Sequence, residues 1–160
     1  MRRRPPLRRV GAVACLLVLG ACGSGSVDID APEVSGADAS ACKALVAALP
    51  SHVADQARRT SNDGAGYGAA WGDPAIVLRC GTGPGQGFRN TSQCQVTDGV
   101  GWYIPDSQIQ GRPVDVTMTT VGRAQNVEVS IPSDYFPPAA AMVDLAPAIK
   151  RTIRDVRPCL

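Results

Sequence analysis

The chain has 160 residues and a formal net charge of +2, but this charge is unevenly distributed. Five of the sixteen basic residues lie in the first nine positions and all fourteen acidic residues lie after position 22, so the part from Cys22 onward has a net charge of −3. That part has no cluster of Lys and Arg interleaved with aromatic residues, which argues against nucleic acid as a partner, and its 139 residues suffice for one domain.

Residues 1–21 have the layout of a secretory signal peptide, with arginines between positions 2 and 9 and an apolar run over Val10–Leu19. This run is much shorter than the ~20 residues that a membrane-spanning helix needs. The sequence Leu19-Gly20-Ala21-Cys22 resembles the lipobox of bacterial lipoproteins, whose cysteine receives a diacylglycerol and becomes the new N-terminus. We therefore expect a lipid anchor at Cys22 that holds the protein on the extracytoplasmic face of the cell membrane. Signal cleavage without lipidation is the alternative.

Residues 22–39 contain Gly, Ser, Pro and acidic residues but no Lys or Arg, which predicts a flexible tether with a reach of ~20–25 Å ahead of a domain at residues 40–160. The alternation within Val27–Asp30 is also typical of a strand that pairs with a sheet edge. A helix is predicted to begin near Ser40, a good N-cap, and to end at Pro50. Its apolar face consists of Cys42, Leu45, Val46 and Leu49.

The next part of the chain is predicted to contain one buried strand between two loops. Residues 52–70 are polar and rich in glycine, which predicts a long surface loop. The apolar run in Ala75–Cys80 predicts a central strand buried on both faces. Residues 81–93 are again rich in glycine and predict a second loop.

Two hairpins are predicted to follow. Asp98-Gly99, between two short apolar runs, supplies the positive φ angles of a two-residue type I′ turn. Strict alternation over Val114–Thr119 and Val127–Ile131, with a turn near Gly122-Arg123, predicts a second antiparallel pair with one face in water.

The chain ends in an amphipathic helix that begins near Pro138 and carries an apolar stripe from Met142 to Val156. Pro147 is predicted either to kink this helix or to lie in the first turn of a fresh helix capped by Asp144. The resulting order is helix, strand, hairpin, hairpin, helix. It predicts an α+β fold with a four- or five-stranded, mainly antiparallel sheet and both helices packed on one face.

Four cysteines remain after the signal and the lipidation site, namely Cys42, Cys80, Cys94 and Cys159. An even number in an exported chain predicts two disulfides, and the long uneven spacing without C-x-x-C argues against a zinc site. Cys80 ends one predicted strand and Cys94 begins the next, so we expect these two to pair. Cys42 is then left to pair with Cys159 and to tie the two helices together.

Neither a catalytic constellation nor a cofactor or metal site is indicated by the residues. His52 is the only histidine, no G-x-S-x-G motif accompanies it, and the glycine-rich Gly81–Gly85 lacks the lysine of a phosphate-binding loop. An arginine within an apolar strand, such as Arg79, needs a partner. It either contacts Asp73 or a carbonyl, or joins a cleft in which arginine holds an anionic ligand and a tryptophan stacks on it. The candidate binding residues are Trp71, Asp73, Arg79, Trp102 and Arg123.

Most of the chain after the tether resembles one known family, an actinobacterial lipoprotein family called domain of unknown function 3515. The most specific block runs from Ala70-Trp71-Gly72-Asp73-Pro74 to Val77-Leu78-Arg79-Cys80-Gly81. The other matching stretches are Ala41–Leu45 with Leu49-Pro50, Gly99–Trp102, Thr119–Arg123 and Val156–Cys159.

The resemblance implies an exported envelope protein and supplies no catalytic residue. We therefore expect a lipid-anchored, non-catalytic binding or accessory module that acts as a scaffold for proteins of the cell wall. The alternatives are a lipoprotein that captures a small anionic ligand and an envelope hydrolase.

Overall fold

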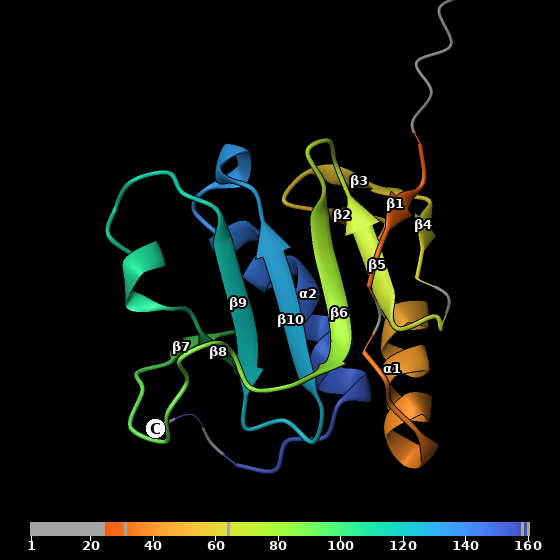
Figure 1. The fold of residues 1–160 in the computed structure, drawn as a ribbon. Coiled ribbons are helices and arrows are strands. Elements are labelled where there is room, and N and C mark those ends of the chain that lie inside the picture. Colours follow the sequence, from red (N-terminus) through yellow and green to blue (C-terminus); the bar gives the residue numbers. More distant parts are fainter. Residues whose placement is uncertain (1–24, 31, 64, 158, 160) are drawn as a thin grey trace, which may run out of the picture.

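The computed structural model describes residues 25–30, 32–63, 65–157 and 159, so the predicted signal peptide and the lipidation site Cys22 lie outside the described residues. In the described part the chain forms a sheet-rich α+β fold with two α-helices (Figure 1). None of the helices described is both long and apolar enough to cross a bilayer.

The centre of the fold is a sheet of eight strands in which each neighbouring pair runs antiparallel. The predicted antiparallel pairing is therefore confirmed, whereas the prediction of four or five strands is wrong. In spatial order the strands are β2 (His52–Val53), β3 (Gln56–Arg59), β5 (Gly68–Trp71), β6 (Ile76–Thr82), β10 (Asn126–Ile131), β9 (Val116–Val121), β8 (Val100–Tyr103) and β7 (Gln95–Thr97).

Two helices, α1 (Gly36–Ala48) and α2 (Ala139–Thr152), pack against one face of this sheet, which we call the inner face, and contact each other. Inner-face residues such as Ile76 and Leu78 on β6 are fully buried. The alternate residues Val77 and Arg79 point to the outer face and are only partly buried, so burial of this strand on both faces is a wrong prediction. The reason is that neither α-helix of the described chain covers the outer face.

Helix α1 begins five residues earlier than predicted, with Ser35 rather than Ser40 at its N-cap. Ser40 lies inside the helix, where its hydroxyl donates to the carbonyl oxygen of Gly36 at 3.3 Å. Two short 3₁₀ helices complete the helical elements, η1 (Asp106–Gln108) and η2 (Ser133–Tyr135). The predicted apolar face of α1 is confirmed, because Cys42 and Leu45 are fully buried.

The predicted loop at residues 52–70 instead contains β2, β3, the start of β5 and a short strand β4 (Ser61–Asn62). The β2–β3 turn consists of Ala54 and Asp55, with φ angles of 48° and 62°, although neither residue is glycine. The carboxylate of Asp144 on α2 accepts a hydrogen bond of 2.8 Å from the backbone N–H of Ala54. Tertiary contact therefore supports a turn for which the sequence has no local signal.

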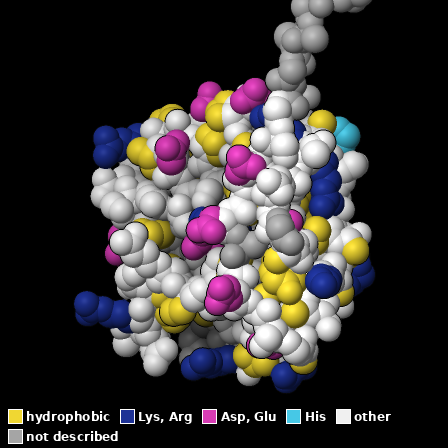
Figure 2. Space-filling view, turned by 45° about the vertical axis from the view of Figure 1, so that its right-hand side comes forward, with side chains coloured by type: hydrophobic (Ala, Val, Ile, Leu, Met, Phe, Trp, Pro, Cys, Tyr) yellow, Lys and Arg dark blue, Asp and Glu magenta, His cyan; other side chains and the backbone are white. Residues whose placement is uncertain are grey.

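An N-terminal strap, defined here as residues 25–30 and 32–35, lies on the outer face of the sheet rather than forming the predicted tether. Its strand β1 (Val27–Asp28) pairs in parallel with β4, which confirms the alternative strand interpretation. Ile29 is buried against β5, where a Cβ on Gly68 would lie 2.9 Å from Ile29 Cγ2. Acidic side chains gather on the face that carries this strap, where Asp28, Asp30 and Glu33 are exposed (Figure 2).

Both predicted hairpins are confirmed. Asp98 and Gly99 connect β7 and β8 with φ angles of 48° and 79°, as a type I′ turn requires. Strands β9 and β10 pair over residues 116–119 and 128–131. Their alternating burial, with Val127, Val129 and Ile131 buried, places one face of the hairpin on the helices.

Helix α2 continues through Pro147, so no second helix begins at Asp144. It ends at Thr152, before the last residue of the predicted apolar stripe. Val156 instead belongs to a C-terminal tail and is half exposed. The tail pairs with the β9–β10 turn through an isolated bridge between Arg123 and Asp155.

The two predicted disulfides are present, but their predicted pairing is wrong. Cys42 pairs with Cys80, with Cα atoms 5.4 Å apart, and Cys94 pairs with Cys159, with Cα atoms 6.2 Å apart. Because α1 lies over the inner face of β6, Cys42 meets Cys80, which shares that face with Leu78. The first bridge therefore ties a helix to the sheet, and the second ties the end of the β6–β7 loop to the C-terminal tail.

Disulfide mapping tests this connectivity directly, since tryptic sites separate all four cysteines. A digest of the non-reduced protein should link the peptide that contains Cys42 to the peptide that begins at Cys80. The double variant Cys42→Ser/Cys80→Ser should lower the free energy of unfolding by about 2–4 kcal/mol in urea denaturation, because the bridge closes a loop of intermediate length. A peptide that links Cys42 to Cys159 would contradict the structure.

Candidate functional site

The two tryptophans that were predicted to bind a ligand are part of the core rather than of a ligand cleft. Trp71 is fully buried on the inner face, and its indole N–H donates to the carbonyl oxygen of Pro50 at 3.1 Å. The guanidinium carbon of Arg58 lies 5.7 Å from the centre of its ring. Trp102 is also fully buried. Neither indole ring is therefore accessible for stacking on a ligand.

Arg79 forms an ion pair with another residue of this chain on the outer face. Its Nη2 lies 2.6 Å from Oε1 of Glu128, its cross-strand neighbour on β10. Asp73, which the sequence suggested as the partner of Arg79, is largely exposed and lies 3.6 Å from Nη1 of Arg59 instead. The structure thus favours the expectation that Arg79 has a structural ion pair, although with a different acid.

Arg123 joins three separate segments. Its Nη1 donates to the carbonyl oxygen of Ile153 at the end of α2 at 3.2 Å, and its Nη2 donates to that of Gly99 in the β7–β8 turn at 2.6 Å. Nη2 also lies 3.8 Å from a carboxylate oxygen of Asp155. The side chain is only 5% exposed, so its donors serve the fold. The five candidate residues therefore do not converge on one cleft.

A different site lies on the outer face, where the β6–β7 loop crosses β8 and β9. This outer-face pocket has a volume of about 740 Å³. Of the predicted binding residues only Arg123 lines it. The lining residues are Pro84, Gly85, Phe88, Arg89, Asn90, Ser92, Cys94, Tyr103, Thr119, Thr120, Val121, Gly122, Arg123, Asn126, Val156 and Arg157.

One wall of the pocket is the β6–β7 loop (residues 83–94), which is packed closely on the sheet. A Cβ on Gly85 would lie 2.8 Å from a ring carbon of Tyr103 on β8, so only glycine fits here. The Phe88 ring contacts the Tyr103 ring edge-on at 5.3 Å between centroids, and the Tyr103 hydroxyl donates to the carbonyl oxygen of Gln86 at 3.3 Å. These contacts hold a glycine-rich loop in one conformation over the sheet.

The opposite wall is the C-terminal tail. The carbonyl oxygen of Gly122 accepts hydrogen bonds from the N–H groups of Val156 and Arg157, at 2.8 and 3.1 Å. Gly122 has a φ of 75° and the Arg157 carbonyl packs directly against it, so a side chain would displace the tail. The Cys94–Cys159 disulfide then connects this wall to the loop wall.

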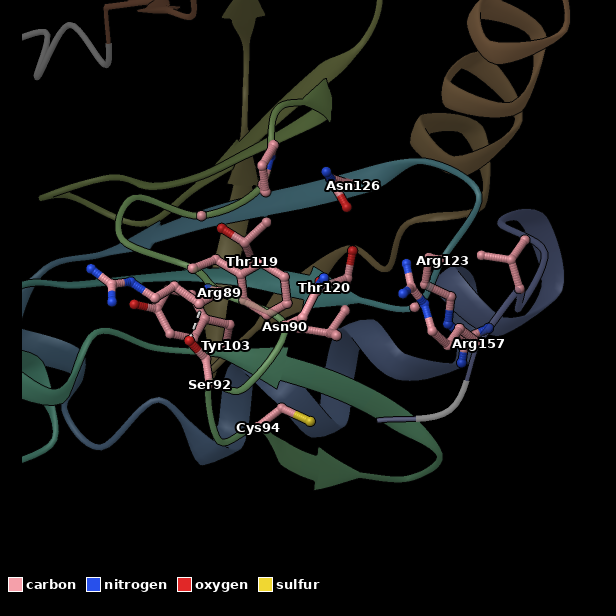
Figure 3. A pocket seen from close by; sticks show the side chains of 16 residues that line it. Arg89, Asn90, Ser92, Cys94, Tyr103, Thr119, Thr120, Arg123, Asn126 and Arg157 are labelled. Carbon is pink, nitrogen blue, oxygen red and sulfur yellow. Dashed lines mark hydrogen bonds between the residues drawn. The ribbon is translucent and has the colours of Figure 1, made fainter. Parts of the chain in front are cut away.

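The pocket combines cations with groups that both donate and accept hydrogen bonds. Its described lining residues include Arg89, Arg123 and Arg157 and no Asp or Glu. Figure 3 shows Arg89 at one end of the pocket and Arg123 and Arg157 together at the other. Between these ends lie amide and hydroxyl side chains of Asn90, Ser92, Thr119 and Asn126.

Acidic charge close to the pocket is neutralised. Glu128 is the cross-strand neighbour of the pocket residue Thr119, and its carboxylate is paired with Arg79. Asp155 lies beside the guanidinium of Arg123. The side chains of Arg89 and Arg157 are exposed and have no hydrogen-bond partner within the described chain. Two arginines are thus available to a ligand.

Sequence reasoning missed this pocket because its residues come from four separated segments. Asn90 and Ser92 lie in the loop that was predicted only from its glycine content, yet both line the pocket. His52 is exposed, with Nδ1 at 3.2 Å from the Ser51 hydroxyl. Among the described residues no group of three His, Cys, Asp or Glu is arranged to hold a metal ion.

Comparison with known proteins identifies a family but no function. The family described as "Protein of unknown function (DUF3515)" matches residues 8–158, which includes every segment that builds the pocket. No curated protein and no solved structure matches the chain.

The contacts of Arg123 predict a large effect of its removal on stability. Arg123→Met should lower the free energy of unfolding by about 2–4 kcal/mol, because it leaves the carbonyl oxygens of Ile153 and Gly99 without their donor. Urea denaturation measures this change. Arg112→Met, at an exposed position outside the pocket, is the matched control and should change stability by less than about 0.5 kcal/mol. Equal effects of the two changes would contradict the structural role of Arg123.

Proposed function

Since the chain belongs to the DUF3515 family, for which no activity is known, we propose from its own geometry that it is a lipid-anchored, non-catalytic binding module of the cell envelope. In this proposal the outer-face pocket captures a small anionic ligand, and the protein serves as an accessory component at the cell wall. The observation that carries the proposal is the composition of the pocket, which has three arginines and no carboxylate among its described lining residues.

The size and the charge of the pocket both support ligand binding. Its volume of about 740 Å³ falls within the range of ~300–1,000 Å³ that is typical of small-molecule sites. Guanidinium groups bind carboxylates and phosphates through paired, charge-assisted hydrogen bonds. Arg157 and Arg89 have these donors free, whereas the donors of Arg123 are used within the fold and its charge is balanced by Asp155.

The position of the strap supports a specific arrangement at the membrane. Arg59 Nη2 donates to the carbonyl oxygen of Gly25 at 2.8 Å, so the chain is attached to the domain at a point three residues after Cys22. Three Cα–Cα steps span at most ~11 Å, so a lipid on Cys22 would hold the domain close to the bilayer. The strap lies over β5 and β6, where Ile29 meets Gly68 and Val34 meets Gly81, and the pocket lies on the same face over β8 and β9.

Charge near the proposed anchor does not replace the lipid. Asp28 and Asp30 of the strap are exposed, and Arg59 adjoins Gly25. Acidic side chains near an anionic membrane surface are repelled from it. In this proposal the lipid, rather than electrostatic attraction, therefore holds the protein, and the outer-face pocket is open to ligands in the cell wall.

Lipidation can be tested in cells that carry out this modification. The wild-type protein should incorporate labelled fatty acid and fractionate with the membrane, because a diacylated cysteine is a stable anchor. Cys22→Ser should abolish both properties without changing the fold, and Cys15→Ser, within the apolar run, is the matched control that should retain them. A wild-type protein without acyl groups in mass spectrometry would refute the anchor.

Anion binding should depend on the disulfide that joins the pocket walls. Calorimetric titration with pyrophosphate should show binding to the wild-type protein that weakens as salt concentration rises. Cys94→Ser/Cys159→Ser should weaken it about tenfold, because it releases the wall that carries Arg157. Cys42→Ser/Cys80→Ser removes the other bridge, away from the pocket, and should bind like the wild type. Absence of binding to the wild type, or equal loss in both variants, would overturn the proposed site.

A further inference from the structure

We infer that the ligand is an acidic polyhydroxyl chain, such as a short glycan or polyol segment, that places one carboxylate or phosphate group at each end of the outer-face pocket. This inference rests on the proposed function, because it specifies the ligand of the same pocket. It follows from three features: where the cations lie, what the side chains between them can bond, and how the aromatic rings are fixed.

The cations are separated rather than clustered. In Figure 3 Arg89 on the β6–β7 loop lies at one end of the pocket, and Arg157 on the C-terminal tail lies at the other, next to Arg123. A single compact anion such as inorganic phosphate can contact one end only. An extended ligand with two anionic groups satisfies both free guanidinium groups, and the separation of the groups then adds selectivity for length.

The side chains between the arginines favour hydroxyl groups as partners. Arginine only donates hydrogen bonds, whereas the amides of Asn90 and Asn126 and the hydroxyls of Ser92 and Thr119 both donate and accept. A ligand that only accepts, such as a polyphosphate, would leave half of this capacity unused. A chain of hydroxyl groups, which also donate and accept, matches it. Asp155 and Glu128 lie nearby but are paired with Arg123 and Arg79, so they do not oppose the charge of the ligand.

Phe88 gives the pocket a fixed apolar surface on the loop that carries Arg89. Its partly buried ring lines the pocket and is held edge-on by Tyr103, which is itself only 8% exposed and donates a hydrogen bond to Gln86. Such a surface suits the carbon–hydrogen face of a sugar or polyol, whose hydroxyl groups point sideways to hydrogen-bonding partners. Its fixed position means that little conformational freedom is lost on binding.

Four probes of similar length distinguish charge from hydroxyl content in calorimetric titrations of the wild-type protein. Digalacturonate carries hydroxyls with two carboxylates, and a dimer of glycerol phosphate carries two phosphates in a polyol chain. Maltose has the hydroxyls without charge, and heptanedioate has two carboxylates without hydroxyls. At least one of the two acidic polyhydroxyl probes should bind about tenfold or more tightly than the last two. Which of these acidic probes binds better identifies the anionic group.

Variants test the two ends of the pocket. Arg89→Gln and Arg157→Gln should each weaken binding of the preferred acidic probe about tenfold, and Arg112→Gln, exposed and outside the pocket, should have no effect. Thr119→Val should weaken the polyhydroxyl probe while leaving heptanedioate unchanged.

Two outcomes would refute the inference separately from the proposed function. In the first, heptanedioate or pyrophosphate binds as tightly as both acidic chains, with binding that Arg157→Gln weakens. This result would support the anion pocket and refute the polyhydroxyl class of ligand. If Arg157→Gln weakens binding of the acidic probe and Arg89→Gln does not, the ligand does not contact both ends of the pocket, and the inference is refuted. If none of the anions binds, the proposed function fails as well.

Discussion

The two faces of the sheet are covered unequally, and the rest of the structure depends on this difference. Eight strands present two faces, but both helices pack on the inner one, where the buried side chains of β6, β9 and β10 form the core. The outer face of a sheet this wide carries half-buried side chains such as Val77 and Arg79 and needs cover from irregular segments. The N-terminal strap covers one side of it and the β6–β7 loop covers the other. The outer-face pocket is the space left between that loop, the sheet and the C-terminal tail.

The strap and the β6–β7 loop are held on the outer face by contacts that differ from those of the core. The strap packs Ile29 against Gly68, and the loop packs Gly85 against Tyr103, so close approach replaces a large apolar interface. Covalent and charged links then add to it: the Cys94–Cys159 bridge, and Arg123 between the β7–β8 turn and the end of α2. The residues expected to bind a ligand, Arg79 and Arg123, instead shape the surroundings of the pocket. Arg79 neutralises the charge of Glu128, and Arg123 holds the end of α2 and the tail in place.

Local signals in the sequence were sufficient for elements whose stability is local. Asp98-Gly99 specified the β7–β8 turn, and alternation specified β9 and β10, because both depend on neighbouring residues. The β2–β3 turn has no such signal, since Ala54 and Asp55 adopt positive φ only with Asp144 of a distant helix beside them. β5 was missed because Gly68-Ala69-Ala70 lacks the bulky residues of a typical strand. The disulfide pairing and the pocket depend on which faces meet in space, and sequence spacing does not encode that.

The distribution of charge connects this architecture to the proposed role. Exposed acidic residues lie on the strap, and the free arginines line the outer-face pocket. Nuclear magnetic resonance of the isotope-labelled domain during a pyrophosphate titration tests the central claim most directly. Shifts in backbone amide signals confined to residues 84–94, to Thr119–Arg123 and to the tail around Arg157 are the predicted result. Shifts centred instead on Arg58 and Arg59 of β3, or none at all, would contradict it.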